Sequence, residues 1–152
     1  EGINNVRVPE NIKVIRKSGQ GTLLANGDRE LLRQVFPNLI NNAIQAMPDG
    51  GELSLITQKS SVPNQSPENG SVARQYISVT VADNGVGMSA DNLAKIFNPF
   101  FTTKDKGTGL GLAISHNIIK AHQGTIDAVS EEGKGTSFTV KIPSWDENFD
   151  EK

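Results

Sequence analysis

Four short motifs, rich in glycine and polar residues, follow one another within residues 81–138 and constrain this chain more than any other feature. They read VADNGVGM, IFNPFFTTK, GTGLGLAI and GKGTSF, and a helix-like segment reading NLINNAIQAM precedes them. Each motif alone is ordinary. Together they contain a carboxylate, amide oxygens, glycines that permit close backbone approach, and a basic segment. A site for a nucleotide and its magnesium ion needs these groups, so the combination predicts such a site.

Composition limits the chain to one domain and argues against several classes of protein. A length of 152 residues suits one domain with a sizeable core, and a net charge of −2 argues against nucleic-acid binding. The absence of cysteine excludes a disulfide framework and suits a reducing cytosol. The sequence has neither an apolar run of bilayer length nor a signal-peptide pattern. We therefore expect a cytoplasmic domain without membrane contact and, because Glu1 is not a methionine, a piece of a larger protein.

Hydrophobic periodicity predicts strands and helices in mixed order. Residues 11–17 alternate apolar and polar side chains, and residues 22–25 follow a Gly-Gln-Gly turn, so these two segments are expected to form a hairpin. Asp28 is a candidate N-cap for an amphipathic helix to about Met47, in which Pro37 predicts a kink or a lost hydrogen bond. Further strands are expected over 52–57, 76–82, 125–129 and 136–142, and a second helix over 109–121.

This order of elements predicts an α/β (α+β) two-layer sandwich, in which helices cover one face of a mixed sheet. We expect a single domain over 1–152, with its core at about 11–143. Residues 59–75 are polar and include two prolines, so a long exposed connection is expected there. The acidic segment 144–152 is expected to fray.

Asp83 ends a predicted strand and begins the sequence Asp-Asn-Gly-Val-Gly. A carboxylate at that point would lie at the bottom of a pocket, and the glycines would let the backbone pass beneath a flat ligand. Asp-Asn-Gly is also a common turn sequence, so this motif alone leaves a simple turn open.

Asn38 and Asn42 are four residues apart and therefore share one face of the predicted helix. Amide oxygens can bind Mg²⁺, which prefers oxygen ligands and keeps several waters. Asn41 lies off that face and is given a lesser role. A single asparagine on an amphipathic helix is more simply explained as solvated, but the pair ahead of Asp83 favours a ligand role.

The segment GTGLGLAI alternates glycine with other residues and then enters a helix. Amides at a helix N-terminus bind anions, and glycines let phosphate oxygens come close. The segment has neither the Gly-Lys-Ser/Thr ending of a Walker motif nor the spacing of a dinucleotide fingerprint. A glycine-rich hinge without a ligand is the alternative.

In this order, the motifs resemble the catalytic and ATP-binding domain of bacterial sensor histidine kinases, in the GHKL superfamily of gyrase-type ATPases and heat-shock chaperones. The resemblance covers about residues 20–143 and implies a Bergerat-type ATP-binding fold with ATP and Mg²⁺ as ligands. The lid is short, as in the nitrogen-regulation sensor kinases. The ligand-binding positions that it implies are Asn38, Asn42, Asp83, Gly85, Gly87, Thr103, Lys104, Lys106, Gly107, Thr108, Gly109, Leu110, Gly111, Leu112 and Thr136.

The resemblance also implies roles for individual residues. Asp83 would accept a hydrogen bond from the adenine amino group, and Thr136 would help to hold the adenine end. Asn38 and Asn42 would bind Mg²⁺ and the phosphates.

Residues 89–106 match the family's ATP lid. Phe97 and Phe100 are expected to anchor it, together with the neighbouring apolar residues Ile96, Pro99 and Phe101. Lys104 and Lys106 are candidate contacts for the γ-phosphate, although lysines beside an aspartate are commonly just solvated. No catalytic residue is assigned with certainty on this chain.

Two departures from the family pattern affect function. Gln45 stands where many relatives carry a lysine or arginine that reaches the γ-phosphate, so neutralisation there would depend more on Mg²⁺ and the lid lysines. Neither His116 nor His122 has the acidic neighbour and Arg/Lys-x-Pro sequence of a phosphoacceptor, so both are expected to be structural.

The resemblance implies a protein-histidine kinase domain that binds MgATP and donates the γ-phosphoryl group to a histidine on a separate dimerisation domain, in two-component signalling. That helical histidine phosphotransfer domain of the same kinase and a response-regulator receiver would be its partners, and the isolated chain would not phosphorylate itself. The alternatives are a GHKL-type serine kinase, an ATPase, or a nucleotide-binding regulatory module without transfer activity. Asn38 argues against an ATPase, because hydrolysing relatives carry a glutamate there.

Overall fold

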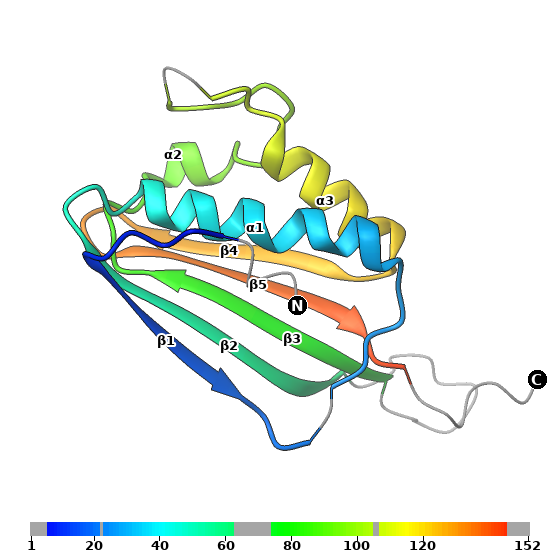
Figure 1. Ribbon diagram of the computed structural model, residues 1–152. Coiled ribbons are helices and arrows are strands. Elements are labelled where there is room, and N and C mark those ends of the chain that lie inside the picture. Colours follow the sequence, from blue (N-terminus) through cyan, green and yellow to red (C-terminus); the bar gives the residue numbers. More distant parts are fainter. Residues whose placement is uncertain (1–5, 22, 63–73, 105–106, 146–152) are drawn as a thin grey trace, which may run out of the picture.

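The computed structural model describes residues 6–21, 23–62, 74–104 and 107–145. The elements are β1 (Ile12–Ser18), α1 (Arg29–Gln45), β2 (Gly51–Val62), β3 (Arg74–Asp83), α2 (Ala90–Leu93), α3 (Gly111–Ala121), β4 (Thr125–Glu131) and β5 (Gly135–Pro143). The helices lie on one side of a single sheet (Figure 1). The predicted two-layer α+β sandwich with a mixed sheet is therefore confirmed.

The sheet has the strand order β1-β2-β3-β5-β4. β1 and β2 are parallel and all other neighbours are antiparallel. Parallel neighbours require a crossover, which α1 provides here. β3 is the central strand, and its last residue, Asp83, lies opposite Leu53 of β2 and Thr136 of β5. Asp83 is therefore placed by two neighbouring strands.

The hairpin expected from residues 11–17 and 22–25 is wrong. β1 pairs in parallel with β2, and Ala25 forms an isolated bridge with Ser144 near the other end of the chain. Trp145 extends this contact by donating its N–H to the carbonyl of Leu24, at 2.8 Å. Every residue of β1 pairs with the long strand β2. The few residues before α1 could not provide so many backbone hydrogen bonds. Thr22 lies outside the described residues.

α1 begins as predicted and ends two residues early. Asp28 Oδ1 accepts hydrogen bonds from the backbone N–H groups of Glu30 (2.9 Å) and Leu31 (3.1 Å), so it is the N-cap. Pro37 lies inside the helix, where it lacks the N–H that another residue would donate.

The strands are longer than predicted, and one helix was not predicted. β2 continues to Val62 and β3 begins at Arg74, so both ends of the expected connection at 59–75 are strand; its middle, residues 63–73, lies outside the described residues. Cross-strand pairing, as between Lys59 and Ile77, places these polar residues in the sheet despite their composition. α2 is a single turn capped by Ser89, whose Oγ accepts from the N–H of Asn92 at 3.2 Å.

The core lies between the sheet and the helices α1 and α3. Its most deeply buried apolar residues are Val35, Leu39, Ile40, Leu53, Val81, Ile119 and Val140. Burying each such side chain contributes about 1.5–3 kcal/mol. This packing holds α1 and α3, the two long helices, against the sheet.

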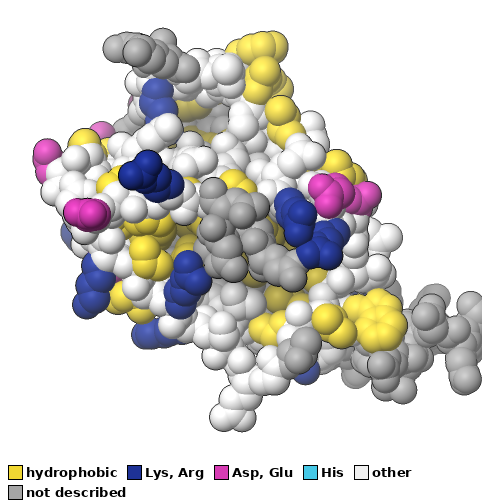
Figure 2. Space-filling model, viewed as in Figure 1, with side chains coloured by type: hydrophobic (Ala, Val, Ile, Leu, Met, Phe, Trp, Pro, Cys, Tyr) yellow, Lys and Arg dark blue, Asp and Glu magenta, His cyan; other side chains and the backbone are white. Residues whose placement is uncertain are grey.

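The described side chains on the face that Figure 2 presents show no single concentration of positive charge. Lys and Arg side chains form several separate groups there, and Asp and Glu side chains lie near some of them. Among the described side chains of this face there is therefore no continuous basic stripe of the kind that nucleic-acid binding uses. None of the described helices has the length and apolar character needed to cross a membrane.

Candidate functional site

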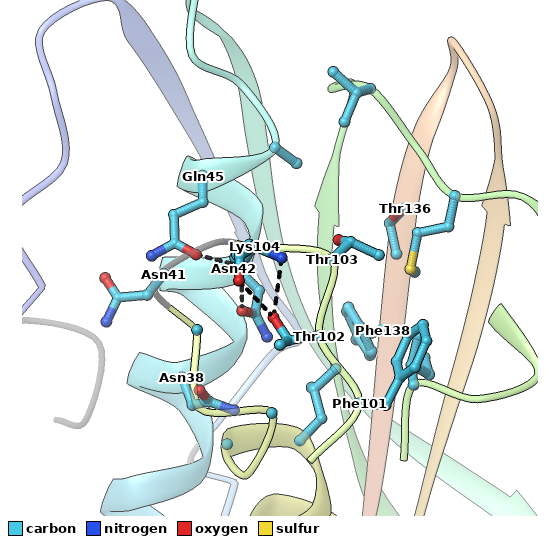
Figure 3. Close-up of a pocket in the computed structure, with 18 of the residues that line it drawn as sticks. Asn38, Asn41, Asn42, Gln45, Phe101, Thr102, Thr103, Lys104, Thr136 and Phe138 are labelled. Carbon is cyan, nitrogen blue, oxygen red and sulfur yellow. Dashed lines mark hydrogen bonds between the residues drawn. The ribbon is translucent and has the colours of Figure 1, made fainter. Parts of the chain in front are cut away.

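An open cavity of about 790 Å³ lies where α1, the segment after β3, the lid and the start of α3 meet (Figure 3). Most of the sequence-predicted ligand positions line it. These are Asn38, Asn42, Asp83, Gly87, Thr103, Lys104, Gly107, Thr108, Gly109, Gly111, Leu112 and Thr136.

Three predicted positions are not among the described lining residues. At Gly85 a Cβ would stand 2.2 Å from the carbonyl oxygen of Ala46, so only glycine lets this segment pack against the end of α1. Leu110 is the N-cap position of α3, and its N–H donates to Thr108 Oγ1 at 3.3 Å. Lys106 lies outside the described residues.

Asp83 is half-buried at one end of the cavity. Its Oδ1 accepts hydrogen bonds from the N–H groups of Gly85 (2.9 Å) and Thr136 (3.3 Å), and no described residue donates to its Oδ2. Burial raises the pKa of the Asp83 carboxyl, although both hydrogen bonds oppose that shift. Oδ2 of this carboxylate is therefore free to accept a hydrogen bond from a ligand.

Thr136 lies beside Asp83 in a small hydroxyl network. Its Oγ1 lies 2.8 Å from Ser130 Oγ, which donates to the Gly135 carbonyl (3.0 Å) and accepts from the Met88 N–H (2.8 Å). Thr136 is itself buried. The network fixes this wall of the cavity by joining β4 and β5 to the segment after β3.

The asparagines of α1 line the cavity but make different contacts. Asn38 donates from Nδ2 to Ser115 Oγ of α3 at 3.2 Å, and a Cβ on Gly111 would stand 2.4 Å from Asn38 Oδ1. Asn42 Oδ1 accepts from Lys104 Nζ of the lid at 3.0 Å. Asn41, predicted to lie off this face, is also a lining residue, although Figure 3 shows its side chain directed away from Lys104.

Lys104 connects the lid to the end of α1. Its Nζ donates to Asn42 Oδ1 and also to Gln45 Oε1 (Figure 3). Partial burial against α1 lowers the pKa of Lys104, while the rest of its side chain stays exposed. A cation therefore already occupies the amide oxygens at this end of the cavity.

The lid is anchored differently from the prediction. Phe97 is half-buried, and its ring centroid lies 5.1 Å from that of His116. Phe101 also packs against the core, but Phe100 is 74% exposed, so its expected anchoring role is wrong. Phe100 has a φ of 67° and donates its N–H to the Gly109 carbonyl at 2.8 Å, and its ring is left outside the core.

Gly109 lies against the backbone of Phe100. Its φ is 70°, and a Cβ there would stand 2.3 Å from the carbonyl carbon of Phe100. Any other residue would be strained and would push the two sides of the lid apart.

The two histidines make contacts within the fold. His122 Nε2 accepts the N–H of Asp28 at 2.9 Å, and its Nδ1 donates to the Ile118 carbonyl at 2.6 Å. Both ring nitrogens are therefore used, and the residue ties the end of α3 to the start of α1. His116 packs against Phe97 under the lid.

Sequence reasoning missed several residues of the site. Phe138 could have been found, because it lies two residues after Thr136 on a strand and therefore on the same face. Thr102, Ser115 and Ser130 carry no local signal, since their roles depend on contacts with distant segments.

Comparisons with known proteins agree with this geometry. Residues 27–146 match the family of histidine kinase-, DNA gyrase B- and HSP90-like ATPases. Sporulation kinase E of Bacillus subtilis (strain 168) is 43% identical over 112 residues, which are 74% of this chain and 14% of that protein. The sensor histidine kinase ZraS of Escherichia coli (strain K12) is 43% identical over 116 residues, which are 76% of this chain and 22% of that protein.

A solved structure gives the same result. The catalytic domain of histidine kinase ThkA resembles this chain with a TM-score of 0.69 and 32% identity, over 88% of this chain and 79% of that one. The chain spans 14–22% of the length of the two curated relatives described above. The matched residues include the described lining of the cavity. The chain therefore belongs to the family of histidine kinase-, DNA gyrase B- and HSP90-like ATPases.

Proposed function

We propose that this domain binds MgATP and donates the γ-phosphoryl group to a histidine on a separate helical dimerisation domain, in cytoplasmic two-component signalling. The observation that carries the proposal is a single cavity with two different ends. One end has the partly buried carboxylate of Asp83, and the other has amide oxygens together with Lys104. The base and the phosphates of a nucleotide need these two different environments.

The residues at the base end fit an adenine. Asp83 Oδ2 has no described donor, and the carboxylate is partly desolvated, so an amino group there would gain a charge-assisted hydrogen bond. Apolar lining from Met88, Ile96 and Phe138 suits the faces of a flat ring.

The residues at the phosphate end fit Mg²⁺. Asn38 uses its Nδ2 to bond Ser115, which leaves its Oδ1 for a ligand, and Asn42 Oδ1 has a second lone pair besides the one that Lys104 Nζ uses. Amide oxygens suit this hard ion, which would neutralise negative charge on the phosphates when bound. The remaining assigned contacts are those of the glycine segment 107–111, of Thr103 and of Lys106.

The transfer itself needs little covalent chemistry from this chain. The bond between the γ-phosphorus and its bridging oxygen breaks with its electron pair left on ADP, and a lone pair of the receiving imidazole forms the new P–N bond. This domain positions the nucleotide and stabilises charge. We assign the receiving histidine to the partner domain. In support, both ring nitrogens of His122 are already hydrogen-bonded, and His116 packs against Phe97. A response-regulator receiver would take the phosphoryl group next.

A phosphorylation assay tests the proposal. Incubated alone with γ-labelled ATP, the chain should not be labelled on His116 or His122. With the dimeric helical domain of the parent kinase added, that domain should acquire acid-labile, base-stable label in trans. Acid-stable label would indicate a serine kinase, phosphate release without label an ATPase, and ATP binding with neither a regulatory module.

A further inference from the structure

The contact between Lys104 and the end of α1 joins residues that are 59 and 62 positions apart in sequence. Both acceptors are neutral amides, Asn42 Oδ1 and Gln45 Oε1. Amides can orient an ammonium without cancelling its charge, whereas a carboxylate would neutralise it. The lysine therefore reaches the cavity with its positive charge available to an anion.

The backbone around Lys104 is held in a position that supports this contact. Its N–H donates to Thr102 Oγ1 at 3.0 Å, and its carbonyl accepts the N–H of Gly107 at 3.2 Å. These bonds fix the backbone of Lys104, and its side chain extends from there to α1. The direction of the ammonium is therefore set from the lid side as well.

The end of α1 provides a second reason for a cation at this point. Gln45 is the last residue of the helix, and its last turn contains no basic residue. Helix C-termini carry partial negative charge and favour cations nearby. The Lys104 ammonium supplies from the lid the charge that the helix itself lacks.

We propose that Gln45 is a positioning residue, which with Asn42 holds the Lys104 ammonium at the phosphate end of the cavity, so that the lid lysine does there what a basic side chain at position 45 would do. This inference rests on the proposed function, since it assigns the γ-phosphate as the anion. Gln45 acts only through its side-chain amide, which holds Lys104.

Nucleotide affinities and a double-mutant cycle test the proposal. Lys104→Met should weaken binding of MgATP by roughly ten- to hundredfold, the value of a hydrogen bond to a charged group, and leave adenosine unchanged. Gln45→Ala should weaken MgATP binding several-fold, and this loss should disappear in the Lys104→Met background. Calorimetry with MgATP, MgADP and adenosine gives all of these values.

A charge exchange gives a result that a merely structural role would not produce. In Gln45→Lys, two cations compete for Asn42, so the lid should open and trypsin should cut after Lys104 faster in the absence of nucleotide. The double variant Gln45→Lys with Lys104→Met should regain the preference for MgATP over adenosine. Gln34→Ala on α1 and Lys95→Met after α2 are matched controls, because both residues are exposed and neither lines the cavity.

Two outcomes would overturn the inference while the proposed function survives. One is that Gln45→Ala and Lys104→Met have additive effects on MgATP affinity. The other is that the charge exchange fails to restore that affinity. If the unmodified chain does not bind MgATP at all, the proposed function itself is wrong. Gln45 and Lys104 are both exposed, so these substitutions leave the core intact.

Discussion

The two ends of the cavity are built from different kinds of structure. At one end, Asp83 and Thr136 lie opposite each other on the paired strands β3 and β5, and backbone hydrogen bonds hold them. At the other end, Asn42 and Gln45 come from a helix and Lys104 from a loop, joined by side-chain hydrogen bonds near the surface. One end is part of the sheet, whereas the other is assembled from separate elements.

This difference indicates which end of the cavity can change its conformation without unfolding the domain. Moving Asp83 would disturb the sheet, since its strand has neighbours on both sides. Releasing Lys104 breaks two hydrogen bonds to exposed groups and leaves the core untouched. Regions with few buried contacts open at low free energy, and lids are drawn from such regions. The base end is therefore expected to select the ligand, and the phosphate end to respond to it.

The largest effect is expected from a substitution of Asn42, at the phosphate end of the cavity. Asn42→Ala removes both a proposed Mg²⁺ ligand and an acceptor of Lys104. It should abolish the gain in ATP affinity that Mg²⁺ provides, while adenosine affinity stays nearly unchanged. Titrations with and without Mg²⁺ measure this gain. A variant that keeps the full Mg²⁺ effect would remove Asn42 from the site.

The matching change at the base end should act on all nucleotides alike. Asp83→Asn replaces the charged acceptor with a neutral one and should weaken ATP and ADP equally, by about 1.5–3 kcal/mol. Calorimetry on both ligands measures the two losses. A loss confined to ATP would place Asp83 near the phosphates and contradict the comparison between the two ends.

A smaller effect should appear when the lid closes on a ligand. Trypsin should cut after Lys104 several-fold more slowly with saturating MgATP than without nucleotide. Arg7, exposed ahead of β1, serves as the internal control. Lys59 and Arg74 would serve poorly, because they lie within β2 and β3. Equal cleavage after Lys104 in both conditions would mean that the lid does not engage the phosphates.

The smallest effect concerns stability and pH. Because burial raises the pKa of Asp83, the folded chain binds this proton more tightly than the unfolded chain. Below the ordinary aspartate pKa both states are protonated and nothing is lost. As pH rises from there through the raised value, the folded state should lose stability relative to the Asp83→Asn variant, and the difference should then level off.

Urea unfolding of both proteins at several pH values measures that difference. Asp127→Asn, at an exposed position of β4, is the control for removing a carboxylate. A difference between the unmodified chain and Asp83→Asn that stays constant over the acid range would contradict the unfavourable burial of the Asp83 carboxylate.

Much of the fold could be predicted from the sequence, because its signals are local. The N-cap Asp28 and the apolar stripe located α1, and alternation located β3. The partner of β1 could not be predicted, since a parallel neighbour some 40 residues away leaves no local pattern. The exposed ring of Phe100 was missed for a similar reason, because the backbone conformation at Phe100 depends on a hydrogen bond to the carbonyl of Gly109.

The candidate site follows the same division. Asp83, Asn38 and Asn42 stand in short motifs whose chemistry is visible residue by residue, and the structure brings them to one cavity. The two hydrogen bonds from Lys104 to Asn42 and Gln45 could not be predicted from the sequence. They require the lid to reach the end of a helix that is distant in sequence.

The hydrogen bond from the Phe100 N–H to the Gly109 carbonyl also bears on how such domains diverge. It closes the stem of the loop formed by residues 101–108, so the ends of that loop meet whatever its length. Each doubling of a flexible loop then adds only about 0.6 kcal/mol of closure entropy. We therefore expect insertions between these two residues to be tolerated more readily than insertions in the sheet. Loop length at this stem is then a property that can change without rebuilding the domain.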